Sequence, residues 1–387
     1  MSNAKKIIED LLLEADIHIN GQNPWDLQVH NEKFYSKLLY NTELALGETY
    51  TDGWWDCRHL DQFFYRALRA NLDKNVTMDS SFFINNIKTF LRNSVAYAIN
   101  LQTKFRSVEV GKKHYDTGND LFKIMLDKRM IYTCAFWENV SNLDEAQERK
   151  LEITCKKLQL QPGMKVLDIG CGWGGLAKYI AEHYNVSVVG VTISEQQYEV
   201  AKAQTQGYPI EILLQDYREL LKNNIKFDRV VSLGMFEHVG HKNYPIYMQV
   251  VNHCLKDDGL FLLHTIGSNK TTNVTNKWIE KYIFPNSHLP SIAQIGTSIE
   301  ELFVMEDWQN YGAHYDKTLM AWHQNFNDNF NKNVNNIELS KKYDARFRRL
   351  WNFYLLSCAG AFRARRNQLW QIVLTKKGWE GGYKRLV

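Results

Sequence analysis

The sequence predicts an α/β protein: a Rossmann-like sheet with helices on both faces, preceded by a small α-rich N-terminal domain. Three observations lead to this prediction. Residues 165–184 read as a strand, a glycine turn and a helix; apolar strands alternate with amphipathic helices from residue 165 to residue 264; and helical periodicity dominates residues 1–92. Strands separated by helices are typical of a parallel, helix-covered sheet, which binds ligands beyond the carboxyl ends of its strands.

The first strand and its turn, KVLDIGCGWGG at residues 165–175, are the centre of this arrangement. The strand carries Asp168, and the turn has glycines at positions 170, 172 and 174. Glycine suits such a turn because a Cβ atom would hold a ligand away from the backbone and would penalise a positive φ. The spacing G-x-G-x-G differs from the G-x-G-x-x-G of pyrophosphate-binding turns. We therefore expect a ligand without phosphate, such as S-adenosylmethionine, although a turn that only joins strand to helix has the same pattern.

The other elements follow from apolar periodicity. The predicted strands of the sheet are 165–169, 186–191, 210–214, 227–232 and 260–264, and its helices are 174–184, 194–205 and 243–255. Upstream, the pattern predicts helices at 5–16, 32–39, 60–72 and 143–158, and a strand at 25–29. Downstream, residues 349–366 read as a helix and the asparagine-rich residues 325–336 as a loop.

These elements divide the chain into three parts. Residues 1–92 are expected to form a small N-terminal domain, residues 93–111 a connecting segment and residues 112–387 a catalytic domain. The N-terminal part contains Trp54 and Trp55 beside a glycine. This pair could contact a membrane or a ligand, but a packed core is favoured because aromatic side chains dominate core energetics.

Composition excludes several classes of protein. No apolar run approaches the roughly 18 residues of a transmembrane helix. The start, MSNAKKIIEDLLLEA, lacks the apolar centre of a signal peptide, so we expect a cytoplasmic protein. The six cysteines are scattered without a C-x-x-C pair, so disulfides and a metal site are both unexpected.

The charge of the chain is unevenly distributed. Residues 341–387 contain 12 Lys and Arg against 2 Asp and Glu, a net charge of +10, so the remainder carries −6 for the whole chain to total +4. A basic tail on an acidic body indicates an anionic partner, either nucleic acid or a lipid surface, unless it is simply a solvated basic face. The apolar character of the helix at 349–366 favours a bilayer over a phosphate backbone.

The end of the second strand argues against a dinucleotide. A dinucleotide oxidoreductase needs an acidic residue about 20 residues after the glycine turn, to hold the ribose. Here the strand ends in GVTISEQQ, where Thr192 stands at the tip and no acid is present. Thr192 and Gln197 would have to make the ribose contacts instead.

Four further residues could carry chemistry. Glu237 follows the fourth strand and His264 ends the fifth, so both lie at the ligand-binding edge of the predicted sheet. Cys134 and Tyr315 lie in segments that spacing does not bring to this edge. Taken singly, each has a structural alternative, such as a helix cap, a satisfied core histidine or simple packing.

The motifs taken together resemble a known family. They are KHYDTGNDLF, YTCAFW, LDIGCGWGGLA, GVTISEQQ, LLQDYREL, SLGMFEHVGHKNY, LLHTIGS, IFPN, YDKTLMAW and CAGAFRARRNQLWQ. In this order they resemble the bacterial cyclopropane-fatty-acyl-phospholipid synthases and, at more distance, the mycolic acid cyclopropane synthases. The resemblance covers residues 112–372, and LGETYTDGWW extends it into the N-terminal part.

The resemblance implies two sites. For S-adenosylmethionine it implies Tyr132, Thr133, Asp168, Gly170, Cys171, Gly172, Trp173, Gly174, Thr192, Gln197, Asp216, Tyr217 and Leu233. For a catalytic bicarbonate it implies Cys134, Glu237, His264, the backbone of Ile266, and Tyr315. Phe284 and Tyr115 match aromatics beside the reacting carbon. Cys358 matches a cysteine given a catalytic role, but methyl transfer from a sulfonium needs no covalent enzyme intermediate, so a structural role is favoured.

The implied activity is transfer of a methylene group from S-adenosylmethionine to the cis double bond of unsaturated phospholipid acyl chains. Bicarbonate would be the base, its own hydroxyl donating to Glu237. The resemblance also implies a homodimer, peripheral contact with the inner face of the cell membrane, docking assisted by the N-terminal domain, and no nucleic-acid partner. Plain methylation on the same fold is the nearest alternative, and nucleic-acid binding is the more distant one.

Overall fold

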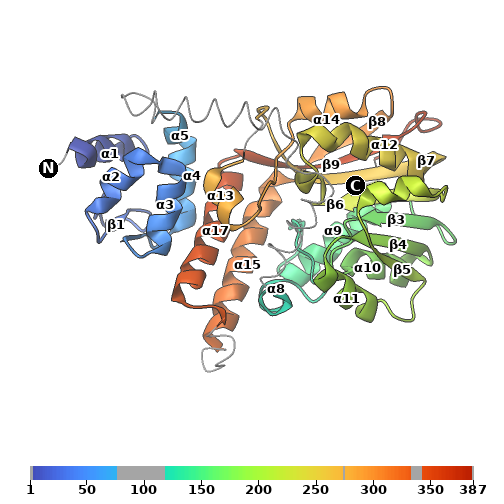
Figure 1. Cartoon of the computed structure of the whole chain (residues 1–387), viewed down its shortest axis with the longest axis horizontal. Helices are drawn as coiled ribbons and strands as arrows, with labels where there is room; N and C mark the ends of the chain where they lie inside the picture. The colour runs from blue at the N-terminus through green and yellow to red at the C-terminus, as the bar shows by residue number, and fades with distance from the viewer. Residues whose placement is uncertain (1–2, 76–117, 273–274, 333–341, 386–387) are drawn as a thin grey trace. The chain divides into compact units, whose positions relative to one another are not determined.

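The computed structural model describes residues 3–75, 118–272, 275–332 and 342–385, which fall into two compact units (Figure 1). One unit comprises the described parts of Met1–Ile99, Val274–Pro285 and Leu319–Asn367. The other comprises those of Asn100–Asn273, Asn286–Thr318 and Gln368–Val387. Each unit is therefore assembled from segments that are distant in the sequence.

The second unit is built around a mixed sheet. Among the described residues it has seven strands in the order β5-β4-β3-β6-β7-β9-β8. Their bounds are β3 Lys165–Ile169, β4 Ser187–Thr192, β5 Ile210–Leu214, β6 Phe227–Leu233, β7 Leu255–Ser268, β8 Val304–Asn310 and β9 Asn367–Thr375. The pairs β3–β4, β3–β6, β4–β5 and β6–β7 are parallel, and β8 runs antiparallel to β9. The predicted fold class is confirmed, whereas β8 and β9 were not predicted.

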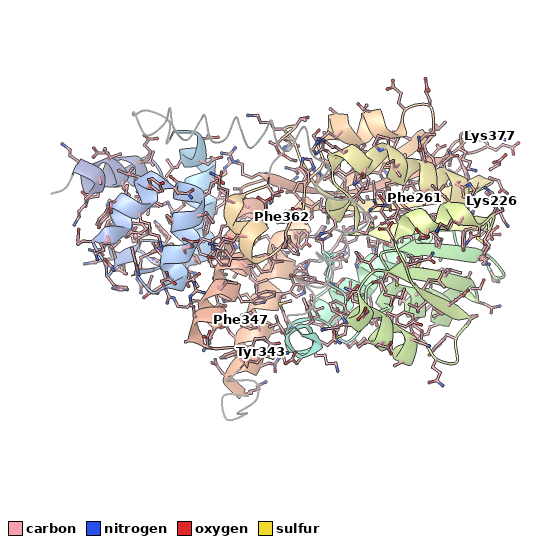
Figure 2. All side chains as sticks on the ribbon, in the orientation of Figure 1. Lys226, Phe261, Tyr343, Phe347, Phe362 and Lys377 are labelled. Atoms are coloured by element: carbon pink, nitrogen blue, oxygen red, sulfur yellow. The ribbon has the colours of Figure 1, made fainter. Side chains whose placement is uncertain are left out.

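Helices cover both faces of this sheet because successive side chains of a buried strand point to opposite sides. Leu167, Val230 and Phe261 pack on one face (Figure 2 labels Phe261), with residues of η1 Tyr217–Lys222, α12 Tyr244–Cys254 and α14 Ile292–Ile299. Their neighbours Val166 and Val231 pack on the other face. That face is covered by α9 Leu143–Lys157 and α10 Gly175–Tyr184.

The parallel register brings the carboxyl ends of four strands to one edge. Thr192 ends β4, and its backbone pairs with the last residue of β5. Leu233, the last residue of β6, pairs with His264 of β7. The Gly234 amide then donates to the His264 carbonyl at 2.9 Å. Thr192 and His264, from separate strands, thus lie at the same edge of the sheet, where such sheets bind ligands.

The first unit is largely helical. It contains α1 Asn3–Leu13, β1 Gln28–Val29, α2 Lys33–Tyr40, α3 Thr42–Thr51, β2 Trp55–Asp56, α4 Leu60–Arg69, α5 Leu72–Asn75, α13 Lys277–Tyr282 and α17 Ala345–Arg363. Trp55 is fully buried among the rings of Phe34, Tyr50 and Phe63, as the core interpretation predicted, whereas Trp54 is only half-buried. Gly360 of α17 lies so close to α4 that a Cβ atom would come within 2.7 Å of the Asp61 carbonyl.

The predicted loop at 325–336 is wrong for residues 325–332, because α15 Gly312–Lys332 runs through them. Asparagine is a weak helix former, but here tertiary contacts outweigh propensity. The Asn327 amide donates to Asn352 of α17 at 2.8 Å, and its oxygen accepts from Arg348 at 2.9 Å. Residues 333–336 lie outside the described residues.

Arginines of the basic C-terminal segment pair with aspartates of the N-terminal helices. Arg349 binds Asp56 at 2.7 Å and donates to the carbonyls of Tyr50 and Trp55. The other pairs are Arg346–Asp52 at 3.1 Å, Arg363–Asp61 at 2.6 Å and Arg366–Asp73 at 2.7 Å. The uneven charge of the sequence is thus partly neutralised inside this unit.

The predicted domain boundary lies outside the described residues, since the segment 93–111 is not among them. Helices α13 and α17 pack with the N-terminal helices, although the predicted division assigns them to residues 112–387. The division into an N-terminal and a catalytic domain therefore stays a prediction. Within the described part of the chain, no helix is long and apolar enough to cross a membrane.

Candidate active site

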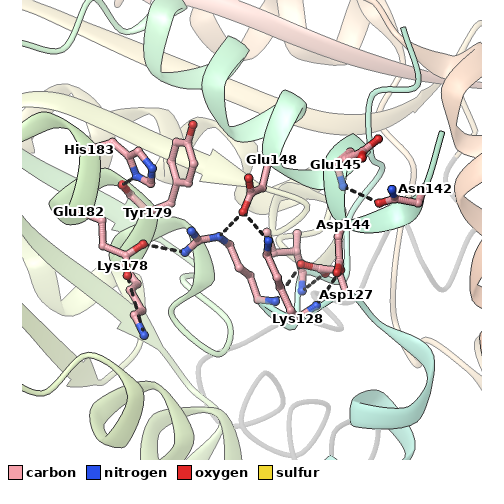
Figure 3. Close-up of polar contacts among 12 residues, drawn as sticks. Asp127, Lys128, Asn142, Asp144, Glu145, Glu148, Lys178, Tyr179, Glu182 and His183 are labelled. Carbon is pink, nitrogen blue, oxygen red and sulfur yellow. Dashed lines mark hydrogen bonds and ion pairs between the residues drawn. The ribbon is translucent and has the colours of Figure 1, made fainter. Parts of the chain in front are cut away.

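The loop at residues 127–131, which precedes the first predicted site residues, is bonded to two helices (Figure 3). The Asp127 carboxylate accepts from the backbone amides of Ile131 at 2.8 Å and Arg129 at 2.9 Å. The Arg129 guanidinium in turn binds Glu182 of α10 at 2.9 Å and Glu148 of α9 at 3.4 Å. The segment that follows, which contains Tyr132, Thr133 and Cys134, therefore starts from a fixed point.

Two polar residues of α9 hold Thr133. The Gln147 amide donates to the Thr133 carbonyl at 2.9 Å, and Lys150 Nζ donates to Thr133 Oγ1 at 2.9 Å. Both side chains are fully buried, and burial lowers the pKa of Lys150 to about 8. Tyr132 packs edge-on against Phe122 of α8 Asn119–Met125, with ring centroids 5.0 Å apart.

The glycine turn follows β3 as predicted. Gly170, Gly172 and Gly174 have φ values of +87°, +56° and +84°. A Cβ atom on Gly170 would lie 2.6 Å from the Met235 side chain, and one on Gly174 would lie 3.2 Å from Thr205. A Cβ atom on Gly172 would meet nothing within 4 Å. Packing therefore accounts for two of the glycines, and Gly172 borders open space.

The residues around this turn differ in their hydrogen bonding: among the described residues, the Trp173 side chain is paired, and one oxygen of the Asp168 carboxyl group is not. Trp173 is buried, and its indole nitrogen donates to Asn119 at 2.8 Å. Cys171 is also buried, which raises the pKa of its thiol well above the usual value. Asp168 Oδ2 has no hydrogen-bond partner in the described part of the chain. Burial raises the pKa of Asp168 to about 7, an effect that the charge of Lys150 opposes.

The residues predicted for the ribose and adenine follow the next strands. Thr192 Oγ1 donates to Gln197 Oε1 at 2.9 Å, so these two predicted contacts lie side by side. Asp216 follows β5 and accepts from the backbone and the side chain of Arg218, both at 2.9 Å. Tyr217 is buried, and Leu233 lies half-buried at the end of β6. The predicted cofactor residues are thus gathered at the carboxyl edge of the sheet.

Glu237 lies in the short helix η2 Phe236–His238, directly after β6. Its Oε1 atom accepts from the backbone amide of Ile266 at 2.7 Å. Its Oε2 atom is buried without a hydrogen-bond partner among the described residues. Burial raises the pKa of Glu237 to about 7, although the Ile266 amide acts in the opposite direction.

His264 lies two residues before Ile266 and is fully buried. Its Nδ1 atom lies 3.4 Å from the Gln371 amide nitrogen of β9, and within the described ranges its Nε2 atom has no hydrogen-bond partner. Burial and the charges of Lys150 and Lys157 hold the pKa of His264 well below its usual value. A neutral imidazole and a carboxyl group that titrates near neutral pH therefore each present an unsatisfied polar atom.

Cys134 and Tyr315, which spacing could not place, lie on adjoining segments. Thr318 of α15 accepts at Oγ1 from the Ala135 amide at 3.0 Å, and His314 accepts at Nδ1 from the Trp137 amide at 3.0 Å. The segment with Cys134 is thus bound to the first turns of α15, which carry Tyr315. Phe136 also stacks near His264, with ring centroids 6.2 Å apart. Cys134 is fully buried, which raises the pKa of its thiol.

Three residues predicted for the site are not among the residues gathered at this edge of the sheet. Tyr115 lies outside the described residues. Phe284 and Cys358 belong to the first unit, where Phe284 packs edge-on against Tyr354 at 5.8 Å. Cys358 is half-buried in α17, and burial raises its pKa to about 12, which disfavours a thiolate. Their predicted roles stay predictions.

Sequence reasoning missed Gln147, Lys150, Thr318 and Gln371. A signal existed for the first two: Gln147 and Lys150 share one helical face with the buried residues Leu143 and Leu151, so polar groups interrupt an apolar stripe. Thr318 lies three residues after Tyr315 and hence on the same face of α15. Gln371 belongs to a strand that was not predicted.

The strand order, the glycine turn and the likeness to solved cyclopropane synthases define the class: this is the fold of the S-adenosylmethionine-dependent methyltransferases. Comparison with known proteins narrows it. The family model for mycolic acid cyclopropane synthetase matches residues 102–372. The chain belongs to this family of enzymes.

Individual relatives agree with this assignment. The chain is 52% identical over 382 residues to cyclopropane-fatty-acyl-phospholipid synthase of Escherichia coli strain K12, covering 99% of this chain and 96% of that protein. It is 34% identical over 279 residues to a probable fatty acid methyltransferase of Pseudomonas putida, with 69% of each covered. A mycolic acid cyclopropane synthase solved with SAH and CTAB is 31% identical, with a TM-score of 0.61, 70% of this chain and 98% of that chain covered.

Proposed function

We propose that this protein transfers a methylene group from S-adenosylmethionine to the cis double bond of unsaturated acyl chains in membrane phospholipids, forming a cyclopropane ring, with bound bicarbonate as the general base. The observation that carries this proposal is the buried carboxyl group of Glu237. One oxygen is held by the Ile266 amide, and the other is left without a described partner near the neutral His264. The name of the Escherichia coli relative supports the substrate class.

The cofactor fits the glycine turn. The open space beside Gly172 lets a ligand approach the backbone, and Thr192 with Gln197 offers hydrogen bonds suited to a ribose. Thr133, held by Gln147 and Lys150, and Asp168 are the polar groups next to this space in the proposal. The related synthase solved with SAH supports this assignment.

The reaction begins as the alkene π electrons attack the sulfonium methyl carbon and the carbon–sulfur bond breaks. Because an alkene is a weak nucleophile, proximity must supply much of the rate. The resulting cation could be stabilised by the faces of Phe284 and Tyr115, at about 2 kcal/mol for a desolvated ring. Loss of a proton from the transferred methyl group then closes the ring.

The base site is defined by residues of this chain. Bicarbonate, when bound, would supply a base less easily methylated than a bare carboxylate. Glu237, His264, the Ile266 backbone, Cys134 and Tyr315 would hold it. Glu237 could bind the anion in two ways. The anion's own hydroxyl can donate to the ionised carboxylate, or a proton held by the carboxyl group, whose pKa burial raises to about 7, can be shared with the anion.

The setting of the reaction belongs to the same proposal. We place the enzyme in the cytoplasm, in peripheral contact with the inner face of the membrane, as a homodimer whose N-terminal part assists docking. The phospholipid named in the relative's description requires such a contact. Four arginines of the basic segment are already paired with aspartates of this chain. We therefore expect apolar contact to contribute more to membrane binding than charge attraction does.

Plain methylation is the second candidate, and the probable fatty acid methyltransferase of Pseudomonas putida favours it. The two reactions differ in which proton leaves the cation. Cofactor with a trideuterated methyl group, incubated with enzyme and unsaturated phospholipid vesicles, separates them by mass spectrometry. We expect two retained deuterium atoms, because ring closure removes one from the methyl group. Three retained atoms would establish a methyl branch and overturn the proposed function.

A further inference from the structure

The segment Ile131–Trp137 carries three of the predicted site residues but has no regular secondary structure. Its buried backbone amides must therefore find partners elsewhere, since an unpaired buried amide is costly. The Phe136 amide donates to the Ala146 carbonyl at 3.0 Å. The amides of Ala135 and Trp137 donate to side chains of α15. The position of this segment thus depends on particular side chains.

The hydroxyl group of Thr318 makes several of the hydrogen bonds that hold this segment. Its hydroxyl accepts from the Ala135 amide at 3.0 Å and from the Trp137 indole at 2.9 Å, and it donates to the His314 carbonyl at 3.0 Å. A hydroxyl group can donate one hydrogen bond and accept two, so this one is fully satisfied. The Cys134 sulfur lies 3.8 Å from the same oxygen.

We propose that Thr318, together with His314, is a positioning residue: it clamps the Cys134–Trp137 segment to α15 and thereby sets Cys134 beside Tyr315 in the anion site. This inference rests on the proposed function, because it assigns the clamp to bicarbonate binding. Cys134 is adjacent in sequence to the clamped amide of Ala135, and Tyr315 lies one helical turn from Thr318. Loss of the hydroxyl would leave the buried Ala135 amide unpaired, and the segment would move to satisfy it.

The structure offers a matched control in Thr49 of α3. Like Thr318, Thr49 is fully buried in a helix, donates to the carbonyl four residues earlier, at 2.6 Å, and accepts from a tryptophan indole, Trp55, at 3.1 Å. It lies in the first unit and belongs to no predicted site. Thr49→Val therefore measures what the loss of such a hydroxyl costs the fold alone.

The test compares Thr318→Val, Thr318→Ser and Thr49→Val in carbonate-free buffer to which bicarbonate is added at constant ionic strength. Two quantities are measured: the bicarbonate concentration that gives half-maximal rate, and the rise in Tm that bicarbonate produces without substrate. We expect Thr318→Val to raise that concentration at least tenfold and to lose the Tm rise, with cofactor affinity changed less than twofold. Thr318→Ser should restore both within threefold, and Thr49→Val should change neither.

Trp137→Phe is a milder second variant, since it removes only the indole bond to Thr318. It should raise the required bicarbonate concentration about threefold, and it keeps the test open if Thr318→Val does not fold. An unchanged bicarbonate response in folded Thr318→Val or Trp137→Phe overturns the clamp and leaves the proposed function standing. A wild-type protein that ignores bicarbonate overturns both the clamp and the proposed base.

Discussion

The backbone amide of Ile266 donates to Glu237 Oε1 at 2.7 Å, while Glu237 Oε2 stays buried without a partner among the described residues. One oxygen is thus used to orient the carboxyl group, and the other remains for a ligand. Neighbouring His264 repeats the pattern: its Nδ1 atom faces the Gln371 amide, and its Nε2 atom has no hydrogen-bond partner in the described part of the chain. An unsatisfied buried polar atom is costly, so two at one sheet edge indicate a binding function.

Glu237→Gln should slow the reaction by on the order of 2–4 kcal/mol of barrier, roughly 30-fold to 1,000-fold, as positioned catalytic groups do. The amide keeps the volume and can still accept from Ile266, but it loses the charge. Removal of carbonate from the buffer should slow the wild type and have less effect on the variant. A wild-type rate indifferent to carbonate would instead assign the role of base to Glu237 itself.

Buried carboxyl groups should make the free energy of unfolding fall as pH rises. Burial raises the pKa of Glu237 from 4.5 to about 7 and that of Asp168 from 3.8 to about 7. Their stabilising contribution is present below the unfolded pKa and is lost as pH rises through the folded pKa. Glu237→Gln and Asp168→Asn should therefore lose part of this decline in urea unfolding between about pH 5 and pH 7.5.

The control for that experiment is Glu148→Gln. Hydrogen bonding to Lys128 lowers the pKa of Glu148, so its contribution is lost only as pH falls below the usual range. This variant should keep the wild-type slope between about pH 5 and pH 7.5. Equal slopes for all four proteins would show that Glu237 and Asp168 are not protonated in the folded state at the lower pH.

The fold could be predicted where local patterns decide it. Apolar runs and the 3.6-residue helical period locate the central parts of β3 to β7 and the helices between them, because each of these strands contains a short apolar run between helical segments. β9 was missed because the buried Gln368 and Gln371 interrupt its apolar run. Its partner β8 was missed with it. The helix through residues 325–332 was missed because its stability comes from contacts with α17.

The site could be predicted only in part for a related reason. Glu237 follows the end of β6, and His264 of β7 pairs with Leu233, the last residue of β6, so the parallel sheet places both at one edge without further information. The segments that carry Cys134 and Tyr315 are joined by the bonds of Ala135 to Thr318 and of Trp137 to His314, across more than 170 residues of sequence. Such side-chain bonds to irregular backbone have no periodic signature. The resemblance named both residues, but the hydrogen bonds explain why they lie on adjoining segments.

Arg363 should stabilise the fold through Asp61. The two side chains meet at 2.6 Å, and the Asp61 side chain is only 7% exposed. Removal of the arginine would leave this nearly buried carboxylate with only the longer contact to His59, at 3.9 Å. Arg363→Gln should lower the free energy of unfolding by on the order of 2 kcal/mol in a urea titration. Arg69→Gln removes an equal charge from an exposed position of α4 and should change it by less than about 0.5 kcal/mol. Equal small losses would mean that the ion pair contributes nothing.

The sharpest prediction concerns Gly172, because the chain supplies its own control. Gly172 and Gly163 both have positive φ, +56° and +84°, and a Cβ atom on either would meet nothing within 4 Å. Gly172 follows the carboxyl end of β3, and Gly163 precedes its amino end. A valine at either position pays the same kind of backbone strain. Only at Gly172 would it also fill the space assigned to S-adenosylmethionine.

Gly172→Val should therefore abolish cofactor binding measured by calorimetry, whereas Gly163→Val should keep the wild-type affinity. Both should lower Tm, since strain at a positive φ costs on the order of 1–3 kcal/mol. The Tm comparison separates strain from occlusion, because strain alone would weaken both variants alike. Binding retained by folded Gly172→Val would remove the cofactor from this turn. Binding lost equally by both variants would mean that β3 as a whole, and not the space beside Gly172, controls affinity.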